Sequence, residues 1–128
     1  MGDRAVITSH PYSPDNIGIY IHWDGDRPAV EAYLQVCKTL GFRDPTEDEY
    51  GWVGLIYVIC QYFNYAGTSI GVEKCCNLDT DNGNNGVYLI GSDFKIVGRK
   101  FNNLGDEENQ ERTNKIKKLI LDKIALRV

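Results

Sequence analysis

The pattern of apolar and polar positions predicts two strands followed by two helices in the first half of the chain. Apolar side chains alternate with other residues over 5–8 and again over 17–23, as expected for strands with one buried face. Apolar positions then recur every three or four residues over 30–40 and over 52–63. That period is typical of an amphipathic helix, so we expect a hairpin followed by a pair of helices.

Residues at the ends of these two helices have the chemistry of helix caps. Asp26 is a candidate N-cap for the first helix, with Pro28 in its first turn and Gly41 at its end. Thr46 and Glu49 have the spacing of a capping box at the start of the second helix, and Gly67 follows its expected end. The buried stripes are predicted to be Val30, Tyr33, Leu34, Cys37 and Leu40 in the first helix, and Trp52, Val53, Ile56, Ile59, Cys60 and Phe63 in the second.

The second half predicts three strands and a final helix. Residues 69–76, 87–90 and 94–101 have strand character, and a tight turn at 91–93 joins the last two. The segment 77–86 is rich in Asn, Asp and Gly and is predicted to be a loop. Asp106 is predicted to cap a helix over about residues 106–126. Its buried stripe is expected to contain Ile116, Leu119, Ile120 and Ile124.

The resulting order of elements is β-β-α-α-β-β-β-α. Strands and helices that occur in separate runs indicate an α+β fold, here with a mostly antiparallel sheet of about five strands and three helices. A chain of 128 residues is normally a single domain, so we expect one domain over residues 1–128.

Charge narrows the classes of function. The chain carries 18 acidic and 14 basic side chains, and nine of the acidic but only four of the basic ones lie in residues 1–50. This balance disfavours direct nucleic-acid binding, which depends on lysine and arginine, and favours a basic protein partner. The first residues lack a signal peptide pattern, and no apolar run approaches the length of about 20 residues that spans a membrane. We therefore expect a cytoplasmic protein without a membrane contact.

The four cysteines and two histidines suggest a structural zinc site. Zinc prefers four cysteine and histidine ligands, although no Cys-x-x-Cys pair is present. The predicted topology would bring together His10, Cys37, Cys75 and Cys76. It would leave His22 and Cys60 elsewhere. The alternative is that the cysteines are small apolar side chains of the core.

Other candidate sites are weaker. Asp79 and Asp81 have the first spacing of a calcium loop, but Ile90 stands where a glutamate is needed, so a connecting loop is the better interpretation. His22 and Asp24 could supply a base and its orienting carboxylate, but no accessible nucleophile accompanies them. We therefore expect no active site, with a small enzyme that uses His22 as an alternative.

Acidic residues in two turns are candidates for a partner-binding surface. They are Asp24, Asp26, Asp44, Glu47, Asp48 and Glu49. Helix capping would also explain the second group, because carboxylates stabilise the positive end of a helix dipole.

Four segments resemble a known family. They are Met-Gly-Asp-Arg-Ala-Val-Ile-Thr at 1–8, Ile-Gly-Ile-Tyr-Ile-His-Trp-Asp-Gly at 17–25, Asp-Asn-Gly-Asn-Asn-Gly-Val-Tyr at 81–88 and Ile-Val-Gly-Arg at 96–99. The resemblance is to small proteins of phages and mobile elements of Gram-positive bacteria, and it covers roughly residues 2–100. The resemblance implies a type II anti-CRISPR protein, and it is compatible with one that contains zinc. It supplies no binding residues.

The leading hypothesis is therefore a binding protein that occupies the nucleic-acid surface of a host CRISPR effector nuclease. Such a nuclease lines its channels with lysine and arginine, which an acidic surface complements. Two alternatives remain. One is sequestration of a defence signalling nucleotide, with Trp23, Tyr57, Arg99 and Lys100 as scattered candidate contacts. The other is the enzyme that uses His22.

Overall fold

The computed structural model describes residues 2–64 and 69–126, and it has the predicted α+β fold. Gly67 lies outside the described residues. The predicted order of strands and helices is confirmed. The strands are β1 (Ala5–Ser9), β2 (Ile17–Ile21), β3 (Ile70–Lys74), β4 (Val87–Gly91) and β5 (Lys95–Lys100), and the helices are α1 (Arg27–Thr39), α2 (Tyr50–Tyr62) and α3 (Gln110–Ala125).

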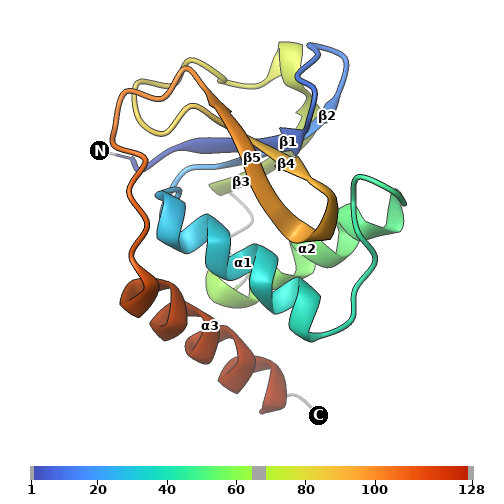
Figure 1. Cartoon of the computed structure of the whole chain (residues 1–128), viewed down its shortest axis with the longest axis vertical. Coiled ribbons are helices and arrows are strands. Elements are labelled where there is room, and N and C mark those ends of the chain that lie inside the picture. Colours follow the sequence, from blue (N-terminus) through green and yellow to red (C-terminus); the bar gives the residue numbers. More distant parts are fainter. Residues whose placement is uncertain (1, 65–68, 127–128) are drawn as a thin grey trace.

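The five strands form one sheet in the order β3-β2-β1-β4-β5. β1 and β2 form the predicted antiparallel hairpin, and β2–β3 and β4–β5 are antiparallel as well. β1 pairs with β4 in parallel, so the first strand of the chain lies at the centre of the sheet (Figure 1). A parallel pair needs a long connection between its strands. Here that connection contains β2, α1, α2 and β3.

The sheet separates a large core from a small one. On one face, Ile7, Ile19 and Tyr88 pack against α1 and α2. On the other face, Val6 and Leu89 pack with side chains of the segment that leads from β3 to β4. β1 is therefore buried on both faces, which explains its continuous apolar run.

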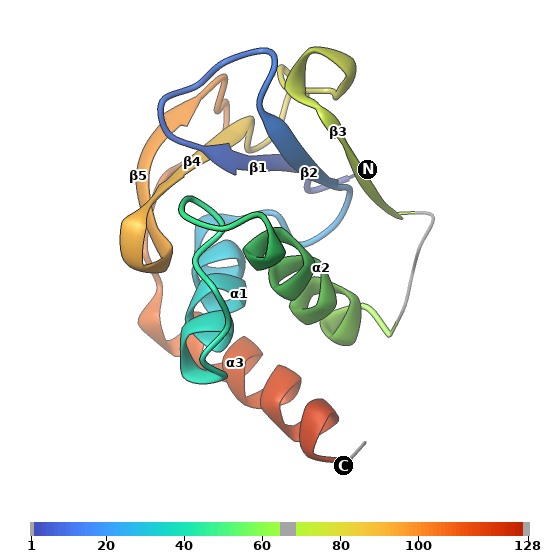
Figure 2. The same ribbon diagram turned by 90° about the vertical axis from the view of Figure 1, so that its right-hand side faces the viewer.

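The helices form two layers on one side of the sheet. Figure 2 shows α1 and α2 next to the sheet and α3 on their far side, away from the strands. Ile116 and Ile120 of α3 are buried, as predicted, but the predicted core residue Leu119 is exposed. Thr113 donates a hydrogen bond to the carbonyl oxygen of Pro28 at 3.0 Å. α3 is thus attached to α1 through a narrow apolar contact that needs polar support.

Ion pairs supply that support. Asp106 precedes α3 and accepts hydrogen bonds from Arg27, at 2.9 Å, and from Arg99. The helix begins at Gln110, not near residue 106, and Asn109 is its cap, accepting a hydrogen bond from the backbone of Arg112 at 3.1 Å. The predicted cap at Asp106 is therefore wrong. Its carboxylate instead binds the side chains of Arg27, which is distant in the sequence, and of Arg99.

These ion pairs make the attachment of α3 sensitive to acid. Burial opposes ionisation of Asp106, but the hydrogen bonds from Arg27 and Arg99 outweigh it and lower the pKa of this carboxyl. A lowered folded-state pKa stabilises the protein above the unfolded value of about 4, and this stabilisation is lost as the pH falls below it.

We expect Asp106→Asn to lower the free energy of unfolding by about 1 kcal/mol at pH 7, because solvent screens a half-exposed ion pair. At pH 3 the difference between the variant and the wild type should shrink. Urea unfolding at the two pH values measures it, and an equal difference at both would contradict the ionic role. Lys118→Gln, which affects an exposed pair within α3, is the control.

Candidate functional site

The predicted zinc ligands do not come together. Cys37 lies in the large core under the helices, whereas Cys75 lies in the small core on the opposite face of the sheet. Cys76 and His10 are exposed. Burial raises the pKa of Cys37 to about 12, so this thiol is held in its neutral form. The fold therefore does not form the predicted four-ligand site.

The different burial of the neighbouring residues Cys75 and Cys76 does not come from the alternation of side chains along a strand. β3 ends at Lys74, and Cys75 and Cys76 lie in a 3-10 turn, so the strand is shorter than predicted. The backbone amides of Cys75 and Cys76 donate to the carbonyl oxygens of Asn16 and Pro14, both at 2.9 Å. The turn is thus bound through its backbone to the loop between β1 and β2, and it leaves Cys75 buried in the small core and Cys76 exposed.

A different group of candidate ligands lies beside α3. One carboxylate oxygen from each of Asp3, Asp24 and Asp26 lies within 4.8 Å of the other two, and no other group of three or more Cys, His, Asp or Glu side chains is as close within residues 2–64 and 69–126. Arg112 occupies two members of this group. It donates to Asp26 at 2.7 and 3.0 Å and to Asp24 at 3.4 Å. The group is a structural anchor for α3.

This anchor changes the interpretation of Asp24 and Asp26. The sequence predicts both as partner-binding residues and Asp26 as a helix cap. In the structure, the side chain of Asp26 makes no capping hydrogen bond to α1, although the residue has the N-cap position. Arg112 thus already pairs with both carboxylates where a basic partner was expected. No local pattern indicates this pairing, because Arg112 lies 86 residues further along the chain.

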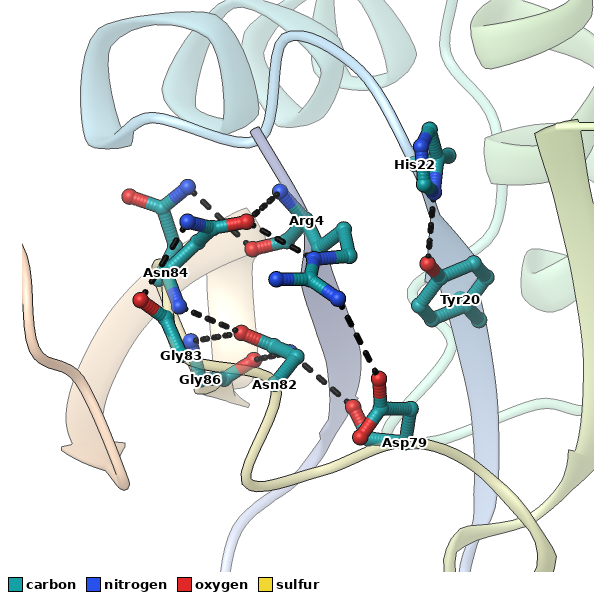
Figure 3. A network of polar contacts seen from close by, with 9 residues as sticks. Arg4, Tyr20, His22, Asp79, Asn82, Gly83, Asn84 and Gly86 are labelled. Carbon is teal, nitrogen blue, oxygen red and sulfur yellow. Dashed lines mark hydrogen bonds and ion pairs between the residues drawn. The ribbon is translucent and has the colours of Figure 1, made fainter. Parts of the chain in front are cut away.

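His22 and Asp24 do not form the base and carboxylate pair that an enzyme would need. His22 hydrogen-bonds through Nδ1 to the hydroxyl of Tyr20 at 2.9 Å (Figure 3), and its ring packs edge-on against Trp23 at 4.7 Å between centroids. Asp24 is directed to Arg112 instead. Both side chains therefore have structural partners.

The loop before β4 is a hydrogen-bonded connection built around Asn82 (Figure 3). The Asn82 side-chain oxygen accepts from the backbone amides of Asn84 and Gly86 at 3.1 and 3.0 Å. Its amide group donates to the carbonyl oxygens of Asp79 and Gly86 at 3.0 and 3.2 Å. Arg4 ties the loop to the start of β1 through a 2.8 Å hydrogen bond to Asn84. The interpretation of this segment as a connecting loop agrees with this network.

The acidic segment before α2 divides into structural and exposed carboxylates. Asp44 accepts from the backbone and the hydroxyl of Thr46 at 2.9 and 2.7 Å, and its second oxygen accepts from the backbone amide of Asp93 at 2.7 Å. Asp48 accepts from the backbone amide of Tyr50 at 2.9 Å and pairs with Arg43 at 2.9 Å. These two carboxylates hold the segment in place and face the chain itself.

The predicted capping box is therefore wrong. α2 begins at Tyr50, four residues after Thr46, and Glu49 makes no side-chain capping hydrogen bond. Glu47 and Glu49 are exposed, and neither forms an ion pair with any residue that the structure describes. They are the two carboxylates of this segment that a partner can reach.

α2 has an unusual outer face. The helix contains no Asp, Glu, Lys or Arg, and its outward side chains Tyr50 and Val53 are 68% and 64% exposed. Tyr57 continues the same stripe one turn further on and is also exposed. Val53 was predicted to be in the core, so this prediction is wrong. A surface helix normally carries charged side chains on its solvent side.

Neighbouring residues fix this stripe in place. Phe42 packs edge-on against Tyr57 with 6.0 Å between ring centroids, and its ring lies so close to Gly54 that an added Cβ would stand 2.9 Å away. The guanidinium of Arg43 lies 4.9 Å from the centre of the Tyr50 ring. We call Tyr50, Val53 and Tyr57 together with Glu47 and Glu49 the α2 surface. It combines apolar side chains with a negative rim.

Comparison of the chain with protein-family models, with curated proteins and with solved structures found no match. None of the helices in the described part of the chain has the length and apolar character needed to cross a membrane. Function therefore has to be inferred from the surface features above.

Proposed function

We propose that the chain is a phage-encoded anti-defence protein that binds a host type II CRISPR effector nuclease through the α2 surface. The observation that carries this proposal is the uncharged helix α2, whose exposed Tyr50 and Val53 lie directly after the exposed Glu47 and Glu49. Exposed apolar patches with a polar rim are typical of protein–protein contacts. The inhibitor acts in the host cytoplasm and transforms no substrate of its own.

The chemistry of the α2 surface suits a groove that normally holds nucleic acid. Such a groove is lined with lysine and arginine, which the carboxylates of Glu47 and Glu49 complement. Aromatic side chains such as Tyr50 contribute large contact areas at small entropic cost and are frequent interface anchors. Binding there excludes DNA by occupying its site.

The test is capture of a purified type II effector nuclease, loaded with guide RNA, by the immobilised protein. The double variant Glu47→Lys/Glu49→Lys is expected to weaken capture at least about tenfold, because each contact changes from attraction to repulsion. Tyr50→Ala should also weaken it about tenfold, which matches the loss of an interface anchor. In parallel, the wild type should prevent the nuclease from binding target DNA.

Matched controls separate the α2 surface from net charge. Glu107→Lys/Glu111→Lys makes the same change in charge near the start of α3, and Leu119→Ala removes an exposed apolar side chain from α3. Both should bind like the wild type. Equal losses in the control and test variants would reject the α2 surface, and a wild type that captures no effector and leaves DNA binding intact would reject the function.

A further inference from the structure

A groove of about 500 Å³ is lined by none of the residues of the α2 surface. Its walls come from α1, from the turn that leads into β5 and from the region of α3, and α1 lies between the other two (Figures 1 and 2). Sites for small molecules typically measure about 300–1,000 Å³. The side chains that line it are Arg27, Glu31, Gln35, Lys38, Thr39, Asp93, Phe94, Lys95, Ile96, Glu108 and Lys117.

The three carboxylates of the groove already have cationic partners. Glu31 pairs with Arg27 at 2.8 Å, and Glu108 lies 3.7 Å from the same guanidinium group. Asp93 pairs with Lys38 at 2.9 Å. The single charge of Arg27 is therefore shared between two carboxylates of the groove, and Arg27 also pairs with Asp106, so these pairs leave part of the negative charge uncompensated.

Two lysines of the groove take no part in these ion pairs. Lys95 enters the groove from β5 and Lys117 from α3, and neither forms an ion pair with any residue within 2–64 or 69–126. Lys117 is half-buried, so solvent reaches its ammonium group less freely than at the outer surface. The side chains that line the groove comprise four cations and three carboxylates, so the lining has a net charge of +1, and the two lysines without an ion pair are the positions where an anion is favoured.

The groove also has an apolar floor. Phe94 and Ile96 are partly buried and pack against the large core. Asp93 and Phe94 both have positive φ angles, 61° and 56°, although neither is glycine. Both residues lie in the tight turn that joins the antiparallel strands β4 and β5, where positive φ angles are common. The turn places the aromatic ring of Phe94 at the groove.

We propose that this groove binds a small phosphorylated compound that carries a flat ring, a ligand of the nucleotide class. Its phosphate groups lie between Lys95 and Lys117, and its ring packs on Phe94. Arginine and lysine recognise phosphate oxygens through charge-assisted hydrogen bonds, and a ring stacks favourably on an aromatic side chain. This site is independent of the α2 surface and of the proposed inhibitor function.

Titration calorimetry on the full chain at low salt tests the proposal, with ADP, adenosine and pyrophosphate as probes. ADP is expected to bind more tightly than either of the other two. Lys95→Gln and Lys117→Gln should each weaken ADP binding about five- to tenfold, which is the loss of one charge-assisted contact. Phe94→Leu should weaken ADP binding and leave pyrophosphate binding unchanged.

Lys115→Gln removes an exposed lysine of α3 that does not line the groove, and it should bind ADP like the wild type. Circular dichroism of each variant checks that it is folded. No binding of ADP by the wild type would overturn the proposal, as would an equal loss in Lys115→Gln. Pyrophosphate that binds as tightly as ADP would overturn the role of Phe94 and of the ring.

Discussion

Gly86→Ala is expected to lower the free energy of unfolding by about 4 kcal/mol, because it combines backbone strain with a steric overlap. Gly86 has a φ of 66°, and an added Cβ would overlap the carbonyl oxygen of Lys100 and stand 2.5 Å from the carbonyl carbon of Phe101. The left-handed conformation costs an L-residue about 1–2 kcal/mol, and overpacking adds about 1–3 kcal/mol. Urea unfolding of the purified variant measures the sum.

Gly83→Ala is the matched control for this prediction. Gly83 also has a positive φ, 76°, but the atom nearest to an added Cβ is a guanidinium nitrogen of Arg4 at 3.6 Å. This variant therefore carries only the conformational cost of about 1 kcal/mol. Equal destabilisation by the two variants would show that the close approach of Gly86 to the end of β5 does not determine its effect.

Asn82→Ala is expected to lower the free energy of unfolding by about 3 kcal/mol, because it removes four hydrogen bonds at once. Each such bond contributes about 1 kcal/mol net, and a buried donor left without an acceptor costs more. The side chain of Asn82 is only 3% exposed, so water does not replace it easily. The amide of Gly86, which donates to Asn82 at 3.0 Å, would lose its acceptor.

Thermal and urea unfolding of Asn82→Ala measure the loss. Asp81→Ala changes the preceding, exposed residue of the same loop and should stay within about 0.5 kcal/mol of the wild type. A variant at Asn82 that unfolds like Asp81→Ala would mean that the loop does not depend on this network. Since Asn82 and Gly86 are in direct contact, their combined substitution should be non-additive.

Local sequence signals located most of the elements correctly. The alternation of residues 5–8 and 17–23 identified the central hairpin, although β2 ends earlier, at Ile21. Pro28 lies in the first turn of α1, and Gly41 follows its end with a φ of 73°. These signals depend on the backbone preferences of single residues, which act before tertiary structure forms.

Capping was the least reliable of the local signals. Asp26 and Asp106 were both predicted at helix ends, but Asp26 pairs with Arg112 and Asp106 pairs with Arg27 and Arg99, and of these arginines only Arg99 is near its partner in the sequence. A carboxylate gains more from a charged hydrogen-bond donor than from one backbone amide. A single sequence gives the position of the helix but not the competing partner, so the choice between them could not be predicted.

The candidate sites depended on topology, which the pattern left open. Cys37 and Cys75 could share a metal only if both side chains lay on the same face of the sheet. In the structure, Cys75 lies in the turn at 75–77 and its side chain is buried on the opposite face from Cys37. Glu47 and Glu49 were among the predicted partner-binding residues, and they are exposed. The exposed stripe of α2 was missed, although the lack of any charged residue in that helix was a visible signal.

The central position of β1 in the sheet affects how the chain folds during its synthesis. Val6 pairs with Val87, so a ribosome has to synthesise most of the chain before the middle of the sheet gains its second neighbour. Pairings between distant residues are slow to form, and until then they leave apolar strand surfaces open to aggregation. Nascent chains that stop before β4 are therefore expected to need chaperones, whereas chains that also contain β4 and β5 can complete the sheet.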